Sequence, residues 1–385
     1  MDFSWNTEQK MLLKELNLFC RKNIAPIVDE YDTEKKLLDA AVLKGMLAEL
    51  SQFGLLSGPI SESYGGGDLG FLTTGLVHQT LAKYYSSLQG VCTIQVCSAR
   101  VLQDSGNEVL KQRYLPDLCS GKKIICSCIT EPGVGSNPLF METTVKKTDE
   151  GLILNGSKTW ISNGSVSDVA IVVAKADESL GDGLTVLLID REESPYQTNE
   201  INKLGLNSFP TSEVYFDNVL VPEENLLVSP GGGLKVILKG FEMARSMMAI
   251  GAVGLGEAAI ELAVDYAKSR KQSGREIGTY QMIQQMIADM KARTESSKLL
   301  SYQAFWMMDQ NMRCDSESSL AKFYSTEASV KTASECVQIL GAYGLSKEYP
   351  AERYFRDARC LTIPDGTTQI QKMIVARHLT GLSAF

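Results

Sequence analysis

Histidine is almost absent from this sequence, which contains only His78 and His378. Catalysis by a Ser-His-Asp or Cys-His group would need one of these two imidazoles. Both lie in helical patterns among apolar neighbours, which favours structural roles. The closely spaced pair Cys126 and Cys128 has no second Cys or His pair nearby, so the ligand set of a zinc site is missing. We therefore expect neither a histidine-dependent nucleophile nor a metal site.

The sequence also lacks a long uninterrupted apolar run and an excess of positive charge. Its most apolar stretch, 247–264, is interrupted by Glu257 and Glu261, whereas a membrane-spanning helix needs about 18 or more apolar residues. The first residues show no basic segment followed by an apolar one, so no secretory signal is expected. Lys and Arg number 38 against 46 Asp and Glu, a net charge of −8, and they are scattered. We expect a cytoplasmic protein that binds neither membrane nor nucleic acid.

What is present is an ordinary globular composition. Of the 385 residues, 44% are hydrophobic and 22% are charged, and this length suffices for roughly two or three domains. The nine cysteines, an odd number, are spread from Cys20 to Cys360. Their spacing does not suggest a disulfide framework, which fits a reducing compartment.

Periodicity divides the chain into three expected domains. Residues 1–118 show amphipathic helical patterns. Residues 119–230 contain short β-rich runs separated by turn residues, which favours an antiparallel sheet or small barrel over βαβ units. Residues 231–385 return to long amphipathic helices, best explained as a four-helix bundle. The expected fold class is α+β, with an N-terminal helical bundle, a central antiparallel β domain and a C-terminal four-helix bundle.

Local signals support these boundaries. Asn6 and Gln9 form an N-terminal capping pattern before the first apolar run. Asn155-Gly156 lies between two β-rich runs and predicts a hairpin turn. Further helices are expected at 37–53, 71–85, 101–114, 237–270, 281–308, 319–340 and 366–378.

Two segments of the β domain combine residue types that suit a bound ligand. In 128–137, hydroxyls, glycines and a proline would let a backbone loop approach a ligand while presenting donors. No Gly-Lys-Ser/Thr ends this loop, so it is not a phosphate loop, and an ordinary strand-to-turn connection remains an alternative. In 158–164, Trp160 could wall a flat aromatic ligand while Ser162 donates to a ring atom. A core Trp beside a turn is the alternative.

A third segment, 363–371, places Asp365 just before the last expected helix. Asp at such a boundary commonly caps the helix N-terminus. It could equally be a carboxylate base that projects into a cleft. The residues alone leave both roles open.

Together and in this order, the three segments resemble the acyl-CoA dehydrogenase family. The resemblance runs from Trp5 to Leu379. It includes Ser63-Tyr64-Gly65-Gly66-Gly67, Lys203-Leu204-Gly205, Phe216-Asp217-Asn218-Val219-Leu220-Val221-Pro222, Arg270-Lys271-Gln272-Ser273-Gly274, Gln281 with Gln285, Ala288-Asp289-Met290, Gln338-Ile339-Leu340-Gly341 and Tyr349-Pro350. Each piece is weak alone, but their joint order is specific.

The resemblance implies an FAD-dependent enzyme with an α–β–α arrangement. In this family an acyl thioester binds with its α–β bond beside the flavin. A carboxylate removes the α proton while the β hydrogen leaves as hydride to flavin N5. Contacts to the thioester carbonyl acidify the α carbon and stabilise enolate-like charge. Such chemistry needs no histidine, which fits the composition.

The resemblance also assigns roles to individual residues. The base would be Asp365. The flavin ring and pyrophosphate would be lined by Ser127, Cys128, Ile129, Thr130, Gly135 and Ser136. The flavin would be covered by Trp160, Ile161 and Ser162. The adenine and pyrophosphate of FAD bound mainly to a neighbouring subunit would be reached by Arg270, Gln281, Gln338, Gly341 and Ala342. The same cofactor would be contacted by Thr367 and Gln369. Substrate would be contacted by Ser136, Phe241, Glu242, Arg245 and Gly366, with Arg245 below the catalytic carboxylate.

The implied partners follow from the same resemblance. Because FAD is shared between subunits in the family, a homodimer or homotetramer is implied. The substrate would be an acyl-CoA or an acyl-carrier-protein thioester, which present the same phosphopantetheine arm. The electron acceptor would be an electron-transfer flavoprotein or O₂.

The sequence departs from the family pattern at the base. The usual base is Glu preceded by Tyr, whereas this chain has Pro364-Asp365. Asp is one methylene shorter, and a misplacement of about 1 Å can cost on the order of 10²-fold in rate. Pro364 restricts the loop that carries the acid. Some relatives place the base on the first bundle helix beside the Arg, but that neighbour here is Ala244. Ser127, often Tyr, and Ser273, often aromatic, are further departures.

These departures leave three interpretations open. In the first, which we favour, Asp365 is a working base and the enzyme is an α,β-dehydrogenase with altered substrate geometry. In the second, the enzyme oxidises an acyl or hydroxyacyl unit tethered to a carrier protein, similar to family members of polyketide extender-unit synthesis. In the third, the flavin supports O₂-dependent oxidation, as in nitroalkane oxidase relatives with an Asp base, or a non-oxidative elimination. A flavin-free binding protein would be a different class. The residues that argue against it are the retained Thr130, Trp160, Ser162, Arg270 and Gln338.

Overall fold

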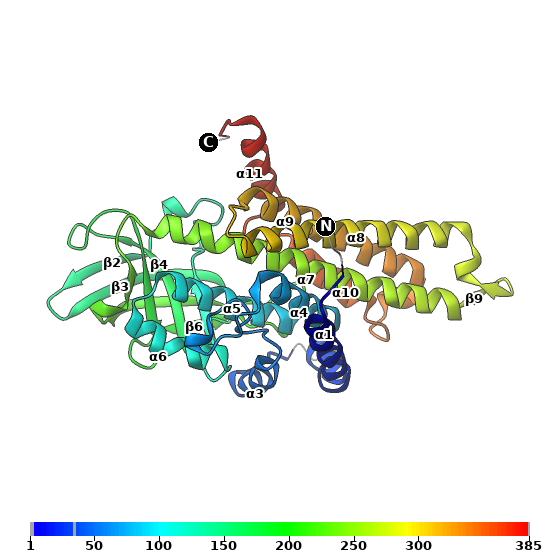
Figure 1. Cartoon of the computed structure of the whole chain (residues 1–385), viewed down its shortest axis with the longest axis horizontal. Coiled ribbons are helices and arrows are strands. Elements are labelled where there is room, and N and C mark those ends of the chain that lie inside the picture. The colour runs from blue at the N-terminus through cyan, green and yellow to red at the C-terminus, as the bar shows by residue number, and fades with distance from the viewer. Residues whose placement is uncertain (1–3, 34–35, 384–385) are drawn as a thin grey trace.

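The computed structural model describes residues 4–33 and 36–383. The chain passes through helices, then a sheet, then helices again. Figure 1 shows the sheet at one end of an elongated molecule, with long helices running to the other end. The α+β fold class expected from the sequence is confirmed.

The N-terminal region is a set of helices with clear start signals. They are α1 (Thr7–Phe19), a π-helical turn (Cys20–Ile24), α2 (Ala25–Thr33), α3 (Ala40–Ser51), α4 (Gly70–Tyr84), α5 (Ser86–Ser105) and α6 (Glu108–Cys119). The capping box is confirmed, because Asn6 Oδ1 accepts the Gln9 N–H at 2.8 Å and Gln9 Oε1 accepts the Asn6 N–H at 3.1 Å. The helix expected at 101–114 is instead two helices, since Asn107 caps α6 and accepts the Leu110 N–H.

The middle region folds into a largely antiparallel sheet. Its strands are β1 (Ile125–Cys128), β2 (Thr144–Thr148), β3 (Gly151–Ser162), β4 (Val169–Ala176), β5 (Leu184–Asp190), β6 (Gln197–Glu200), β7 (Thr211–Val221) and β8 (Leu226–Val228). The order is β6-β7-β3-β2-β4-β5-β8, with β1 beside β4. The β1–β4 and β2–β4 pairs are parallel, which the sequence did not indicate.

The hairpin turn predicted at Asn155-Gly156 is wrong. Strand β3 runs straight through these residues, and its register against β7 shifts between Leu154 and Gly156. Gly156 has φ +144, and a Cβ there would lie 2.7 Å from Thr143 Cα. The glycine therefore permits a bulge and a close backbone approach rather than a turn.

The C-terminal region is built around one very long helix. Its elements are α7 (Gly233–Ser269), the hairpin β9 (Lys271–Gln272) and β10 (Arg275–Glu276), α8 (Gln281–Asp309), α9 (Asp315–Leu340), α10 (Ala351–Leu361) and α11 (Thr368–Thr380). With 37 residues, α7 spans about 55 Å. Helix α10 was not expected from periodicity, and α11 projects from the rest of the chain in Figure 1.

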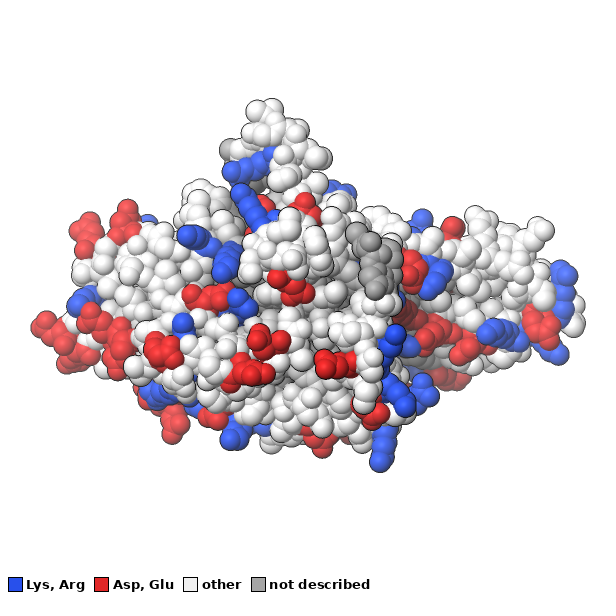
Figure 2. Space-filling view, in the orientation of Figure 1, with Lys and Arg blue, Asp and Glu red and all other residues white. Residues whose placement is uncertain are grey.

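Helix α7 is long and apolar enough, by length and composition, to cross a membrane. Of its most apolar window, 72% is buried inside the structure. It packs against α4, α8 and α9, and this packing accounts for its apolar composition. Figure 2 shows Lys and Arg interspersed with Asp and Glu over the face drawn, and acidic side chains gather at the sheet end.

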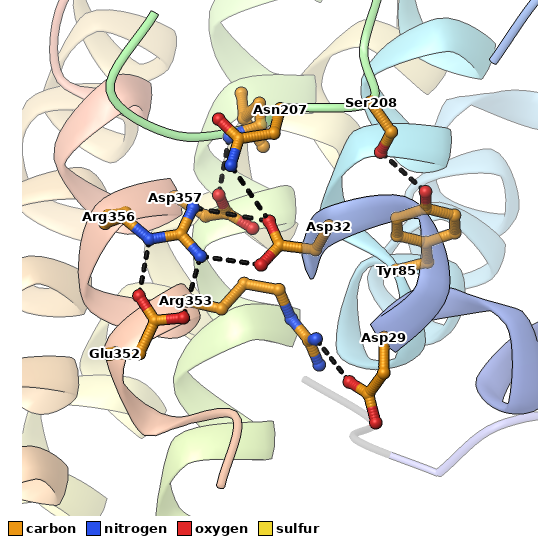
Figure 3. Close-up of polar contacts among 10 residues, drawn as sticks. Asp29, Asp32, Tyr85, Asn207, Ser208, Glu352, Arg353, Arg356 and Asp357 are labelled. Atoms are coloured by element: carbon orange, nitrogen blue, oxygen red, sulfur yellow. Dashed lines mark hydrogen bonds and ion pairs between the residues drawn. The ribbon is translucent and has the colours of Figure 1, made fainter. Parts of the chain in front are cut away.

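The three regions meet at a polar junction beside α10, drawn in Figure 3. Arg356 donates from Nη2 to Asp32 of α2 at 2.6 Å and to Glu352 on its own helix at 2.9 Å. Asp357 accepts the Leu206 N–H from the β6–β7 connection at 2.6 Å. Burial raises the pKa of Asp357 to about 6. One helix thus bonds to segments from both other regions.

Neither histidine and none of the cysteines forms a metal site in the described part of the chain. His78 is fully buried and its Nε2 lies 2.9 Å from the Leu55 carbonyl oxygen. Burial lowers its pKa to about 4, so the ring is neutral at physiological pH. The Sγ atoms of Cys126 and Cys128 lie 3.8 Å apart, and both thiols are free.

Candidate active site

The first candidate segment follows β1 and forms an exposed loop. Ser127, near the end of β1, shares a 2.8 Å hydrogen bond with Ser98 of α5. Gly133 and Gly135 have no atom within 4 Å of where a Cβ would sit, and Ser136 is exposed. Among the described residues, nothing crowds these two glycines on the side where a Cβ would project, so the backbone there is open to a bound group.

The second segment contains a backbone outlier at Trp160. Its φ of +59 is rare for a bulky residue, and its side chain is 57% exposed. The register between β3 and β7 shifts between Lys158 and Ile161, so Trp160 sits in a bulge while Ile161 stays buried. A Trp packed in the core would need neither this exposure nor this bulge. The core-Trp alternative is therefore excluded.

A buried ion pair fastens these two segments to each other. Lys158 of β3 has a fully buried side chain and donates to Glu131 Oε1 at 2.8 Å and to the Ile129 carbonyl at 3.1 Å. The Thr159 N–H also donates to the Thr130 carbonyl at 2.9 Å. Thr130, Trp160 and their neighbours are thus held as one unit.

The carboxylate of Glu131 is fully committed to this unit. It accepts the Glu142 N–H at 2.6 Å and the Thr143 N–H at 3.0 Å in addition to Lys158. Burial alone would raise the pKa of Glu131, but these donors outweigh it and the pKa lies below its usual value. A carboxylate stabilised in its ionised form by three donors is a poor proton acceptor.

The third segment is a tight turn between α10 and α11 that carries Asp365. Asp365 has φ +55 and Gly366 has φ +92. The φ of Gly366 is one that residues with a side chain rarely adopt, so a substitution there would be strained. The cap of α11 is Thr367, whose Oγ1 accepts from the Ile370 N–H, and the helix begins at Thr368 rather than at Gly366. The N-cap alternative for Asp365 is therefore wrong.

The side chain of Asp365 is left without a donor. Among the residues that the structure describes, no N–H or O–H donates to its carboxylate, although its backbone carbonyl accepts from Gln371 Nε2 at 2.8 Å. Burial raises the pKa of Asp365, and the charges of Lys322 and Arg245 only partly offset this effect. A carboxylate with a raised pKa and no internal partner has the properties of a general base.

Arg245 lies on α7 and faces the same acid. Its side chain is buried, and its Nε has no hydrogen-bond partner in the structure. Its guanidinium lies 5.4 Å from the ring of Phe241. Burial lowers the pKa of Arg245, while Asp365, Asp315 and Glu242 raise it. Of these three acids, Asp365 acts most strongly on the pKa of Arg245.

Glu242, one turn before Arg245, has a different environment from Asp365. Burial and the nearby Asp315 raise the pKa of Glu242, while Cys314 donates to it from Sγ at 3.7 Å. Glu242 therefore differs from Asp365 in that its carboxylate already accepts a hydrogen bond. The sequence gives Ala244 at the position where some relatives carry a base, so Asp365 has no local substitute.

The remaining expected cofactor residues lie elsewhere on the chain. Arg270 caps the far end of α7, 25 residues beyond Arg245, which corresponds to about 37 Å along the helix. The expected adenine- and pyrophosphate-binding residues are all exposed and lie towards this distal end of the bundle. They are Arg270, Gln281, Gln338, Gly341 and Ala342. Arg270 lies 5.7 Å from the ring of Tyr343. The structure therefore does not bring this group together with Asp365 and Trp160 within one chain.

Thr367 and Gln369 stand at the start of α11, directly after the acid. Thr367 is half-buried and caps the helix, whereas Gln369 is exposed. A cofactor that contacts them must therefore approach from outside the turn.

Three residues important to the site were not singled out from the sequence. They are Glu131, Lys158 and Lys322. Glu131 and Lys158 stood inside the two quoted segments but had no assigned role. Lys322 lay in a helical pattern where a lysine usually faces water, and nothing local signals its burial.

The residues that the structure brings together fit a flat, anionic dinucleotide. The bulged and exposed Trp160 offers an aromatic face, and the open loop at 132–136 offers backbone donors. Ser162 is half-buried in the same segment. These features match the flavin end of FAD and leave its adenine end to other residues.

Comparisons with known proteins agree with this site. Family models of acyl-CoA dehydrogenase match the chain in three parts, the N-terminal domain over 6–122, the middle domain over 126–219 and the C-terminal domain over 231–380. Glutaryl-CoA dehydrogenase of Desulfococcus multivorans is 37% identical over 389 residues, which cover 99% of each protein. The caffeyl-CoA reductase–Etf complex subunit CarC of Acetobacterium woodii is 32% identical over 97% of this chain and 99% of its own length.

Solved structures give the same result. A glutaryl-coenzyme A dehydrogenase in complex with glutaryl-CoA has a TM-score of 0.94 and 36% identity, covering 99% of this chain and 97% of its own. The prolyl acyl carrier protein oxidase AnaB has a TM-score of 0.92 and 31% identity, covering 98% and 100%. The FAD complex of PigA has a TM-score of 0.91 at 28% identity, covering 98% and 99%.

The fold, the site and these relatives define an FAD-dependent oxidoreductase that acts on acyl thioesters. The chain belongs to the acyl-CoA dehydrogenase family, which confirms the resemblance seen in the sequence.

Proposed function

We propose that this protein is an acyl-thioester dehydrogenase in which Asp365 removes the α proton of the substrate. The observation that carries this proposal is the unpartnered carboxylate of Asp365, whose pKa is raised by burial, facing the buried Arg245. When bound, FAD supplies an acceptor for the β hydride at flavin N5. The C–H electron pair left by the α proton forms the new α–β double bond as that hydride departs, so protons and electrons balance.

The other residues of the site position the reactants. The unit formed by Glu131 and Lys158 would hold Thr130, Trp160 and Ser162 against the flavin. Arg245 would keep Asp365 ionised in the resting enzyme, because its charge opposes the effect of burial on that pKa. Phe241, Glu242 and Ser136 would line the path of the thioester arm.

Asp365→Asn tests the base directly. The substitution removes the proton acceptor but keeps the size of the side chain, so we expect flavin reduction to slow by about 10²- to 10⁴-fold while FAD stays bound. Anaerobic stopped-flow absorbance at the flavin band, with a panel of acyl-CoA and acyl-carrier-protein thioesters, measures the rate. Wild-type bleaching rates in the variant would remove Asp365 from the mechanism.

A second candidate is oxidation of an acyl unit tethered to a carrier protein. The similarity to the prolyl acyl carrier protein oxidase AnaB over 98% of the chain favours it, and the small Ser127 leaves room beside the site. The same panel separates the candidates, because reduction by carrier thioesters alone, or by CoA thioesters alone, identifies the carrier of the acyl group. Reoxidation by air or by an electron-transfer flavoprotein then identifies the electron acceptor.

We further propose that two chains share each FAD. Arg245, which interacts with Asp365, and Arg270 of the distal group lie about 37 Å apart along α7, so one compact site in one chain would not use both. A homodimer, alone or paired into a tetramer, would bring the distal group of one chain to the loop of its neighbour.

Arg270→Ala tests this sharing. Loss of an Arg–phosphate contact should weaken FAD binding by roughly 10- to 100-fold and shift the oligomer towards monomer. Fluorescence titration of FAD and analytical ultracentrifugation measure the two effects. The matched control is Arg275→Ala on the same hairpin, where Arg275 packs on the Tyr280 ring at 4.1 Å and no loss is expected. Wild-type FAD affinity and assembly in Arg270→Ala would refute the shared site.

A further inference from the structure

Lys322 is a fully buried lysine, and no carboxylate of residues 4–33 or 36–383 forms an ion pair with it. It lies on α9 with a relative exposure of 0%. Its Nζ donates to the Thr362 carbonyl at 3.0 Å and to the Gly366 carbonyl at 2.8 Å. These two carbonyls bracket the turn that carries Asp365, so one side chain closes the turn from both ends.

The turn has a second internal support that carries no charge. Gln371 of α11 donates from Nε2 to the Asp365 carbonyl at 2.8 Å and to the Gly366 carbonyl at 2.9 Å. The backbone carbonyls of the turn are therefore held by two side chains, while the carboxylate of Asp365 remains free to meet substrate. Asp365 has φ +55, a left-handed conformation that costs a non-glycine residue some free energy, so these hydrogen bonds to the turn help to stabilise it.

An uncharged amide could supply the hydrogen bonds that Lys322 makes, as Gln371 does. Burying an ammonium costs several kcal/mol more than burying an amide. The charge must therefore be offset by a favourable interaction, and Asp365 is the acid whose charge acts most strongly on Lys322. Burial lowers the pKa of Lys322 to about 8, which keeps it mostly charged at neutral pH.

We propose that Lys322 is a positioning residue that holds the Asp365 turn in its left-handed conformation and keeps the half-buried carboxylate ionised. This inference rests on the proposed role of Asp365 as the base. Lys322 does not touch substrate or cofactor in this role. It fixes where the carboxylate points and sets the pH above which the carboxylate can accept a proton.

Other groups also face this cluster, and the test must separate them. Arg245 of α7 lowers the pKa of Asp365 together with Lys322. Glu327 of α9 raises the pKa of Lys322, and it accepts a hydrogen bond from Thr368 at 2.6 Å. Cys97 of α5 also lies within range of Asp365, but burial raises the pKa of this thiol so far that it stays neutral.

The first experiment compares Lys322→Met with Gln371→Met. Both variants lose two hydrogen bonds to the turn, but only the first loses a charge. In the FAD-loaded enzyme, flavin reduction by the best thioester of the panel is followed from pH 5 to 9. We expect the acidic limb of the rate profile to move up by about one pH unit or more in Lys322→Met and to stay in place in Gln371→Met. An unmoved limb in Lys322→Met, or equal movement in both variants, would overturn the proposal.

The second experiment does not depend on activity. Thermal unfolding of the FAD-loaded protein is measured for the wild type, Lys322→Met, Asp365→Asn and the double variant. We expect Lys322→Met to lower Tm by several degrees more when Asp365 is present than in the Asp365→Asn background, because only then is a buried carboxylate left without its compensating charge. Equal losses in both backgrounds would show that Lys322 supports the carbonyls alone, and would overturn the assigned charge effect.

The two experiments distinguish failure of this proposal from failure of the proposed function. If Asp365→Asn reduces flavin at the wild-type rate, Asp365 is not the base, yet the Tm cycle still reports whether Lys322 and Asp365 are coupled. Asp365→Asn could be inactive while Lys322→Met changes neither the acidic limb of the pH–rate profile nor the Tm coupling with Asp365. Asp365 would then remain the base, and the proposed role of Lys322 would be wrong.

Discussion

Two buried lysines, Lys158 and Lys322, act on nearby carboxylates in different ways and leave them with opposite pKa shifts. Lys158 in the β domain bonds a carboxylate directly, with Glu131 Oε1 at 2.8 Å. Lys322 in the bundle bonds two carbonyls and acts on Asp365 only through its charge. In the first arrangement the carboxylate oxygens of Glu131 accept hydrogen bonds from protein donors, and the pKa of Glu131 lies below its usual value. The second leaves its carboxylate unbonded, and the pKa of Asp365 lies above it.

The difference separates a structural acid from a reactive one. Glu131 gains three donors and becomes a fastening between the loop and β3. At Asp365 only the backbone carbonyls of the turn accept hydrogen bonds from Lys322 and Gln371. Its carboxylate can therefore still contact a substrate and bind a proton. Loss of contact with water favours the neutral form of both acids, and the bonding of the carboxylate oxygens decides the outcome.

Lys158→Met should remove the buried ion pair with Glu131 and have the largest effect on stability of the substitutions considered. The substitution leaves the buried Glu131 without its cation, which costs about 3–5 kcal/mol of unfolding free energy, and it should release FAD because loop and bulge lose their connection. Urea unfolding and FAD titration measure both losses. Lys146→Met, at an exposed lysine of β2, is the matched control.

The double variant Lys158→Met/Glu131→Gln tests whether the loss of stability comes from leaving the Glu131 carboxylate without its cation. Removing both charges avoids an unpaired buried carboxylate, so it should be more stable than Lys158→Met alone. A double variant that is no more stable than the single one would mean that the ion pair is not what links the two segments.

Asp357 is an intermediate case, because its buried carboxylate has one strong donor, the Leu206 N–H at 2.6 Å. Burial raises its pKa from 3.8 to about 6. The folded state therefore holds a proton between these values that the unfolded state has released. Its contribution to stability is full below pH 3.8 and declines as pH rises towards 6, by at most about 3 kcal/mol.

Asp357→Asn removes this decline. The stability of the variant relative to the wild type should therefore rise between pH 4.5 and 7, as measured by urea unfolding at both values. Asp29→Asn, whose side chain is 83% exposed, is the control and should show no such trend. A constant difference between Asp357→Asn and wild type across this range would show that Asp357 is ionised throughout.

Local signals in the sequence were sufficient for the order of the three regions and for several helix starts. The Asn6–Gln9 capping box is formed as expected, because it depends only on residues three apart. The hairpin predicted at Asn155-Gly156 is wrong. Glycine is needed there because the backbone of Thr143, on a neighbouring segment, lies too close for a Cβ. Close approaches between strands are tertiary properties that a local pattern does not contain.

The candidate site was predictable to a similar degree. Asp365 and Trp160 were identified through motif order, and their unusual φ values agree with special roles. The residues alone left Asp365 as a possible helix cap, a role that Thr367 takes instead. Lys322 was missed because its burial arises from the packing of α9 against the turn, and a lysine in a helix sequence carries no sign of it.

Asp365→Glu sharpens the reactive side of the comparison and should have the smallest effect. Because Lys322 and Gln371 fix the carbonyls of the turn, the backbone cannot retreat to make room for an extra methylene. The carboxylate would then be displaced by about 1 Å, which should slow flavin reduction on the order of 10²-fold, equivalent to about 2.7 kcal/mol. FAD affinity and Tm should stay close to wild-type values, since the substitution keeps the negative charge that interacts with Lys322. Single-turnover anaerobic reduction measures the rate, and a variant as fast as the wild type would show that the turn does not hold Asp365 rigidly, contrary to the contrast drawn with Glu131.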